Sequence, residues 1–119
     1  WVVVGCGGDR DPTKRPLMAA VAAREAARAV LTSDNPRSES PEAILAQMVT
    51  GLPSRKAAHT EVDRARAIAF AVKQAAPADV ILIAGKGHED YQEIRGVKTP
   101  FSDIAQARMA LAERAGGRA

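Results

Sequence analysis

The sequence predicts an α/β domain built on an open, mostly parallel sheet with helices on both faces. Short apolar runs that resemble strands alternate along the chain with segments of helical periodicity, in a β-α-β-α order. The clearest strand is Val80–Ala84, whose uninterrupted apolar run is typical of a parallel strand buried on both faces. Further strands are expected at residues 1–6 and 29–33, and a short one at residues 57–60.

Hydroxyl or carboxylate caps and prolines near the first turn mark the starts of the helices. These starts fall at Arg15-Pro16, Ser40-Pro41, Asp63, and Ser102 or Asp103. The first helix carries an apolar stripe at residues 17, 18, 21 and 22, and the third should turn Ile68 and Val72 inward. Near the C-terminal end, residues 91–95 and 97–101 flank Gly96 and predict a small β-hairpin.

Composition narrows the classes of function. The 119 residues make one domain, with 46% apolar residues and a formal net charge of +3. Lys and Arg are interspersed with Asp and Glu, and only 3% of the residues are aromatic, which argues against nucleic-acid binding. The single cysteine excludes an internal disulfide and fits a reducing cytoplasm. No apolar run approaches the roughly 20 residues that span a bilayer, so we expect no membrane insertion.

Three polar clusters directly follow three of the predicted strands. They occupy residues 5–11, 34–37 and 85–90, with the sequences Gly-Cys-Gly-Gly-Asp-Arg-Asp, Asp-Asn-Pro-Arg and Gly-Lys-Gly-His-Glu-Asp. Loops after parallel strands meet at one edge of the sheet, where ligands bind. The clusters therefore predict one pocket that offers two arginines, carboxylates and backbone amides. Such a pocket suits a small zwitterion that bears both carboxylate and ammonium groups.

The glycine-rich cluster after the first strand offers Arg10 as an oxyanion-binding residue, with Asp9 and Asp11 holding its guanidinium. Its glycines permit a tight turn, although they lack the G-x-G-x-x-G spacing of a dinucleotide site. The alternative is a solvated turn with weak local ion pairs. Lys14 and Arg15 lie at a helix start, where backbone amides favour anions, so each is either a phosphate contact or a solvated charge.

The Asp34–Arg37 cluster should be stiff, because Pro36 restricts Asn35 to an extended conformation. Arg37 has a planar fork that can hold a carboxylate through two hydrogen bonds. Asp34 and Asn35 can accept hydrogen bonds from an ammonium group. The alternative is an ordinary turn, which an Asn-Pro dipeptide commonly starts.

The last cluster is not an ATP-binding phosphate loop, because glycine follows Lys86 where that motif requires Ser or Thr. Gly85 can present backbone groups to a ligand, and Glu89 can pair with an ammonium. His88 has three open interpretations: a general base, a neutral hydrogen-bonding group or a structural residue. Because His59 and His88 have no spacing that matches a metal site, no metal site is predicted.

These clusters, with Lys14-Arg15-Pro16-Leu17-Met18 after the first, resemble the C-terminal domain of the Mur ligases over essentially the whole chain. The Asp-Asn-Pro-Arg element resembles that of the members that add meso-diaminopimelate, whereas members that add lysine differ at the arginine. The resemblance implies a Rossmann-like fold and a pocket for the incoming amino acid. The pocket residues that it implies are Arg10, Asp34, Asn35, Pro36, Arg37, Gly85 and Glu89.

Within that pocket, the resemblance implies that Arg10 and Arg37 bind carboxylate, that Glu89 binds the ammonium and that Gly85 contributes its backbone. It places the chain in a bacterial, cytoplasmic, ADP-forming ligase of peptidoglycan precursor synthesis. Residues 1–119 would be its amino-acid-binding domain without the first segment of that domain. The implied partners are meso-diaminopimelate, a UDP-N-acetylmuramoyl dipeptide and the ligase's own central domain.

The central domain, which would bind ATP and Mg²⁺, and the N-terminal UDP-binding domain are absent from this chain. We therefore expect no catalytic residue in the fragment and no activity from it alone. Two alternatives stay open on the residues themselves. One is a non-catalytic nucleotide- or anion-binding module, which glycine-rich turns and a net charge of +3 would also serve. The other is a structural domain without a ligand.

Overall fold

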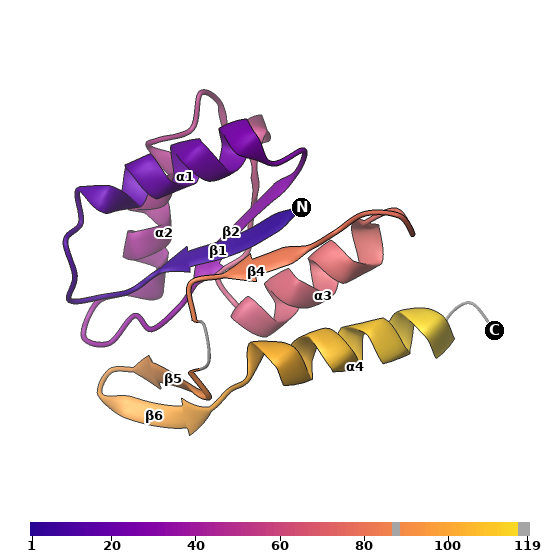
Figure 1. Cartoon of the computed structure of the whole chain (residues 1–119). Helices are drawn as coiled ribbons and strands as arrows, with labels where there is room; N and C mark the ends of the chain where they lie inside the picture. Colours follow the sequence, from indigo (N-terminus) through magenta and orange to yellow (C-terminus); the bar gives the residue numbers. More distant parts are fainter. Residues whose placement is uncertain (87–88, 117–119) are drawn as a thin grey trace.

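A computed structural model describes residues 1–86 and 89–116. Within these residues, four parallel strands form a sheet in the order β3-β2-β1-β4, and helices cover both of its faces (Figure 1). The strands are β1 (Val2–Cys6), β2 (Ala29–Ser33), β3 (His59–Thr60) and β4 (Leu82–Ala84). The predicted open parallel α/β sheet is confirmed.

The order of the strands creates a switch point next to β1. From β1 the chain moves sideways to β2 and β3, and then returns to place β4 on the other side of β1. In register, Val3 of β1 lies opposite Val30 of β2 and Ile83 of β4. Because open α/β sheets bind ligands outside the carboxyl ends of the strands at such a point, the loops after β1 and β4 face the expected site.

Alternating residues of the central strands build a separate core on each face of the sheet. Helices α1 (Lys14–Glu25) and α2 (Pro41–Val49) cover one face, and α3 (Arg64–Gln74) and α4 (Asp103–Gly116) cover the other (Figure 1). The first core contains Val4, Leu31, Ile44 and Met48, and the second contains Val3, Val30, Ile68 and Val72. The inward positions predicted for Ile68 and Val72 are therefore confirmed.

Side-chain caps fix the starts of three helices. Ser40 Oγ accepts a hydrogen bond from the Ala43 amide at 3.2 Å, and Asp63 Oδ1 accepts one from the Arg66 amide at 3.0 Å. At α4, Ser102 Oγ accepts a hydrogen bond from the Ala105 amide at 3.2 Å. Ser102 rather than Asp103 is thus the cap of the last helix.

The predicted hairpin is confirmed, with β5 (Tyr91–Ile94) antiparallel to β6 (Val97–Pro100). Its turn residues Arg95 and Gly96 have φ values of 53° and 78°. Positive φ at both central residues is the requirement of a type I′ turn, the form whose twist matches a two-residue hairpin.

The expected burial of the Val80–Ala84 run on both faces is wrong. The strand is only three residues long and lies at the edge of the sheet, with Val80 81% and Leu82 61% exposed. An edge strand has a neighbour on one side only. Leu17 and Val21 on the apolar stripe of α1 are exposed as well, and they border a hollow of about 710 Å³ beside β4. The short strand expected at residues 57–60 is also trimmed, because a 3₁₀ turn occupies Arg55–Ala57.

Arg64, the first residue of α3, forms hydrogen bonds with the carboxyl ends of two strands and with the start of α4. Its guanidinium donates to the Ser33 carbonyl oxygen at the end of β2 and to the Ala84 carbonyl oxygen at the end of β4, each at 3.1 Å. It also binds both carboxylate oxygens of Asp103 at 2.8 Å, at the start of α4.

Across the described residues, no helix is long and apolar enough to cross a bilayer.

Candidate functional site

The glycine turn after β1 and the Asp34–Arg37 loop after β2 are bonded directly to each other. The Gly8 amide donates a hydrogen bond to the Asn35 carbonyl oxygen at 2.7 Å, and Arg37 Nη1 donates one to the Gly8 carbonyl oxygen at 2.9 Å. A Cβ atom at Gly8 would lie 1.8 Å from the Pro36 carbonyl oxygen, so no side chain fits there. The first two polar clusters therefore meet at one edge of the sheet, as the sequence predicts.

Arg37 is held by the hairpin in a left-handed backbone conformation, with φ of 53°. Its amide donates to the Glu93 carbonyl oxygen at 2.9 Å, and its carbonyl oxygen accepts from the Arg95 amide at 2.5 Å. Among the described residues, Nη1 is the only nitrogen of its guanidinium with a hydrogen bond. The rest of the half-buried fork is therefore available to a carboxylate.

Arg10 borders the same glycine turn as Arg37. A Cβ atom at Gly7 would lie 2.8 Å from Arg37 Nη1 and 3.5 Å from Arg10 Cγ. The two arginine side chains thus converge on the open side of Gly7.

The prediction that Asp9 and Asp11 hold the Arg10 guanidinium is wrong. The Asp9 carboxylate accepts hydrogen bonds from the Ser38 hydroxyl and amide instead. The Asp11 carboxylate accepts them from the Thr13 hydroxyl at 2.7 Å and the Thr13 amide at 3.0 Å, and these bonds lower the pKa of Asp11. Short acidic side chains readily bond to the backbone a few residues away. Within the described part of the chain, Arg10 consequently has no ion pair.

Asn35 is the centre of a polar junction and is only 1% exposed. Its Oδ1 accepts hydrogen bonds from Lys86 Nζ and from the Glu93 amide, both at 3.0 Å. Its Nδ2 lies 3.5 Å from Glu89 Oε1, at the limit of a hydrogen bond. One buried side chain thus joins the loop after β2, the loop after β4 and strand β5.

Glu89 and Gly85 contact the Asn35 and Asp34 side of the loop. The second carboxylate oxygen of Glu89 accepts a hydrogen bond from the Tyr91 hydroxyl at 3.3 Å. Gly85 has φ of 110°, and a Cβ atom there would lie 3.4 Å from the Gly5 carbonyl oxygen and 3.7 Å from Asp34 Oδ2. The space beside Gly85 is therefore bordered by the Gly5 carbonyl oxygen and the Asp34 carboxylate.

Lys86 and Gln92 belong to this junction, although neither was predicted from the sequence to be part of it. Lys86 is 3% exposed, and its Nζ lies 3.1 Å from Asp34 Oδ1. Gln92 Nε2 donates to the Asp34 carbonyl oxygen at 2.8 Å. The position of Lys86 in the polar cluster after β4 is a usable signal, but the sequence does not show whether its ammonium is buried or solvated. Nothing in the sequence marks Gln92.

The remaining candidates lie elsewhere. Arg15 is 2% exposed, so a solvated charge is wrong for this residue. Its guanidinium binds both carboxylate oxygens of Glu39 and the Gly7 carbonyl oxygen, and the hydrogen bond to Arg15 lowers the pKa of Glu39. Lys14 is exposed and borders the hollow beside α1. His88 lies outside the described residues.

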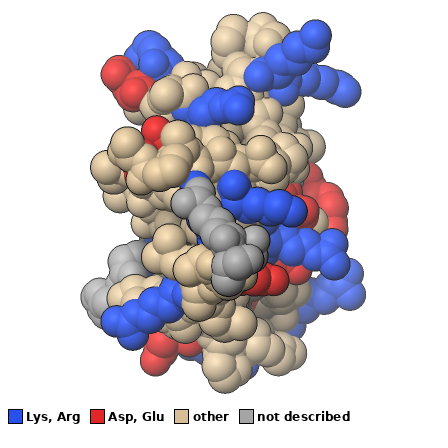
Figure 2. All heavy atoms as spheres, turned by 90° about the vertical axis from the view of Figure 1, so that its right-hand side faces the viewer, with Lys and Arg blue, Asp and Glu red and all other residues tan. Residues whose placement is uncertain are grey.

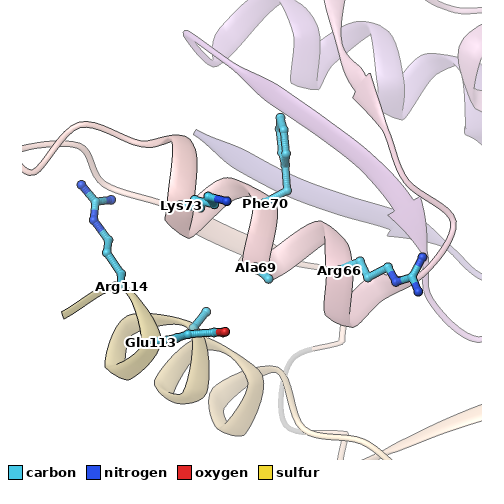
Figure 3. A pocket seen from close by; sticks show the side chains of 7 residues that line it. Arg66, Ala69, Phe70, Lys73, Glu113 and Arg114 are labelled. Carbon is cyan, nitrogen blue, oxygen red and sulfur yellow. The ribbon is translucent and has the colours of Figure 1, made fainter. Parts of the chain in front are cut away.

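A second hollow, of about 550 Å³, lies between α3 and α4, and the side chains that line it are drawn in Figure 3. Its lining residues include Arg66, Phe70, Lys73, Glu113 and Arg114. None of the candidate site residues predicted from the sequence lines this hollow.

The face of the molecule shown in Figure 2 carries Lys and Arg beside Asp and Glu.

The arrangement is suited to a ligand that carries charges of both signs. A continuous series of contacts runs from Arg10 past Gly7 to Arg37, and through the Asn35 junction to Glu89. Guanidinium groups of this kind can pair with a carboxylate, and a carboxylate such as that of Glu89 can pair with an ammonium. Within residues 1–86 and 89–116, no group of three His, Cys, Asp or Glu side chains is placed to hold a metal ion.

The family model described as "Mur ligase, glutamate ligase domain" matches residues 1–87. The chain belongs to the Mur ligase family. The Mur ligases most similar to it include the UDP-N-acetylmuramoyl-L-alanyl-D-glutamate--2,6-diaminopimelate ligases of Acidovorax sp. (strain JS42) and Chromobacterium violaceum. The chain is 58% identical to the first over 98% of its own length, and 59% identical to the second over 93%.

A solved structure of a UDP-N-acetylmuramoyl-L-alanyl-D-glutamate--2,6-diaminopimelate ligase matches 97% of the chain with a TM-score of 0.90 and 49% identity. The chain spans 23% and 22% of the lengths of the two curated Mur ligases, and 24% of the solved chain. The likeness therefore covers one part of those longer proteins.

Proposed function

We propose that this domain binds meso-diaminopimelate as the amine substrate of an ATP-dependent, ADP-forming ligase of peptidoglycan precursor synthesis. One observation carries the proposal. The guanidinium of Arg37 lies against the glycine turn that Arg10 also borders, and the carboxylate of Glu89 lies beside the Asn35 side chain of the same Asp34–Arg37 loop. meso-Diaminopimelate has two carboxylates and two amino groups, so it needs partners of both signs. The names of the similar ligases, which include 2,6-diaminopimelate, support this choice of substrate.

The same arrangement gives a physical basis for rejecting lysine. Lysine lacks the distal carboxylate of diaminopimelate, so bound lysine would leave the guanidinium of Arg37 desolvated without a partner. A site built around such a polar pair discriminates strongly against an analogue that cannot complete it. The discrimination also requires a rigid surrounding of the Arg37 guanidinium. Four residues of the pocket would supply it: Asp34, Asn35, Pro36 and Gly85.

The contribution of this chain to the reaction is to bind and orient the amine. Holding a nucleophile in position lowers the barrier of a two-substrate reaction by several kcal/mol. We assign ATP and Mg²⁺ to the rest of the ligase, because this chain has no G-x-x-x-x-G-K-[ST] loop. The UDP-N-acetylmuramoyl dipeptide would meet the bound amine between this domain and the central domain, in the bacterial cytoplasm. The fragment alone would be inactive.

Kinetics of the ligase that contains this chain test the proposal. Arg37→Ala should raise KM for meso-diaminopimelate at least tenfold while KM for ATP stays within about twofold. The substitution removes a charged hydrogen bond between the protein and the amino acid, but none between the protein and ATP. Arg24→Ala is the matched control, because Arg24 is an exposed arginine whose ion pair with Glu25 is on the surface. Equal effects of Arg37→Ala on both KM values would contradict the assignment.

Titration of the same ligase with meso-diaminopimelate, lysine, ATP and inorganic phosphate separates the alternatives. Amide shifts at Arg37 and Glu89 that saturate with meso-diaminopimelate alone are the expected result. Saturation by phosphate or ATP at Arg10 and Arg37, without any response to the amino acid, would favour an anion-binding module instead. No saturable shift with any of the four would favour a structural domain.

A further inference from the structure

The ammonium of Lys86 is buried at the point where three segments of the site meet. Nζ donates a hydrogen bond to Asn35 Oδ1 at 3.0 Å and one to the Tyr91 carbonyl oxygen at 2.6 Å, and it lies 3.1 Å from Asp34 Oδ1. The Lys86 side chain is fully buried and that of Asp34 is 12% exposed. The Lys86 ammonium is therefore stabilised by protein groups rather than by water.

The contact between Lys86 and Asp34 is a charge contact rather than an aligned hydrogen bond, because Asp34 Oδ1 has no hydrogen-bond partner in the described residues. The rings of Tyr91 and Phe101 each lie 5.8 Å from Nζ and add a favourable cation–π environment. A buried ammonium with this many specific partners holds those partners in place, since each would lose a charged hydrogen bond or a counter-ion if it moved.

We propose that Lys86 is a positioning residue for amino-acid recognition, which sets the geometry of Asp34 and Asn35 and, through Asn35, of Glu89. This inference rests on the proposed function. Lys86 binds Asn35 Oδ1, which obliges the Asn35 amide group to turn Nδ2 toward Glu89. The rotamer of Asn35 and the direction of the Glu89 carboxylate are thereby linked to a cation whose side chain is fully buried.

Lys86→Met keeps an unbranched side chain that is one heavy atom shorter, and it removes the charge and the hydrogen-bond donors. In the ligase that contains this chain, it should raise KM for meso-diaminopimelate roughly ten- to hundredfold, the factor that loss of one charged hydrogen bond implies. KM for ATP should change less than about twofold. The preference for meso-diaminopimelate over lysine should fall as well.

Arg114→Met is the matched control, because Arg114 Nη1 donates to the Val72 carbonyl oxygen at 2.5 Å, a bond as short as that of Lys86 to Tyr91. Arg114 belongs to α4, and its side chain borders the hollow between α3 and α4, which contains none of the candidate site residues. Both variants should lower Tm, but only Lys86→Met should change KM for the amino acid. Equal changes in KM in both variants, or a change in Tm alone for Lys86→Met, would overturn the proposal.

Two further measurements separate positioning from general damage. Asn35→Ala and Lys86→Met should be non-additive in KM, because Lys86 acts through Asn35. In the substrate-free ligase, Lys86→Met should also speed hydrogen exchange at the Glu93 amide, which donates to Asn35 Oδ1. Additive effects on KM, or unchanged exchange at Glu93, would contradict the role of Lys86. If exchange changes as expected but the unmodified ligase shows no preference for meso-diaminopimelate, the proposed substrate fails and the positioning role of Lys86 stands.

Discussion

Single buried charges fix the loops around the candidate site. Arg15 is 2% exposed, and it holds Glu39 and the Gly7 carbonyl oxygen from the first turn of α1. Glu39 also accepts a hydrogen bond from the Asp9 amide at 2.6 Å. One ion pair therefore connects the glycine turn to the segment that follows Arg37.

Acid should weaken this connection. The hydrogen bond to Arg15, and then the bond from the Asp9 amide, lower the pKa of Glu39 from its ordinary value of 4.5. Because the folded pKa lies below the unfolded one, the stabilisation is fully present above pH 4.5 and is lost as pH falls through the folded value. Glu39→Gln should therefore flatten the dependence of the free energy of unfolding on pH below 4.5. Glu25→Gln, in the exposed pair with Arg24, is the control, and an identical pH profile in both variants would contradict the prediction.

At the scale of residues, the sequence predicts which loops meet more accurately than it predicts the hydrogen bonds within them. Arg37, Asn35 and Glu89 were predicted to lie together from the ends of their strands alone. The partners of Asp9 and Asp11 were mistaken, because proximity in sequence favoured Arg10 while Ser38 and Thr13 offered better-directed donors. Sequence order cannot indicate a donor such as Ser38, which the fold brings from 29 positions away.

Among the elements, the β5–β6 hairpin has the most direct bearing on the site. Its first strand bonds the backbone of Arg37 and the side chain of Asn35, and its turn bonds the other side of Arg37. The hairpin projects from the carboxyl edge of the sheet, below the loops in Figure 1. The order of the hairpin therefore determines how firmly the Asp34–Arg37 loop is held.

Gly96→Ala tests the hairpin without creating a clash. Nothing lies within 4 Å of the position of a new Cβ atom, but φ is 78°, so only backbone strain is added. We expect a loss of about 1 kcal/mol in the free energy of unfolding, measured by urea denaturation. Gly116→Ala is the matched control, since that Cβ would also be in open space and the residue lies in α4. A loss of similar size at Gly116 would show that the strain at Gly96 is not the cause.

Elements were predictable where a local signal decides them. Ser40 and Asp63 cap their helices as expected, because a cap depends on residues only three positions apart. The edge position of β4 was not predictable, because an apolar run such as Val80–Ala84 is the same whether one neighbouring strand is present or two. The burial of a strand is a property of the whole sheet.

On the scale of the whole molecule, Arg64 joins parts that no other described side chain brings together. It is bonded to the ends of β2 and β4 and to the start of α4, and its side chain is fully buried. Arg64→Met would leave the carboxylate of Asp103, which is 11% exposed, without its counter-ion.

Removing one member of a buried ion pair typically costs about 3–5 kcal/mol, a large part of the stability of a domain this size. We therefore expect Arg64→Met to lower the free energy of unfolding by about that amount in urea denaturation. Arg24→Met, at an exposed ion pair, should change it by less than about 0.5 kcal/mol. Comparable losses in the two variants would mean that the Arg64 network does not stabilise the fold.

The position of Asp103 also has a consequence during synthesis. A growing polypeptide leaves the ribosome N-terminal end first, so β1, β2 and α3 emerge before the carboxylate that Arg64 requires, which follows 39 positions later. Until then, a nascent molecule that collapsed early would either bury the Arg64 guanidinium without its counter-ion or leave the carboxyl edge of the sheet open to water. Completion of this edge is thus deferred until translation has passed the start of the final helix.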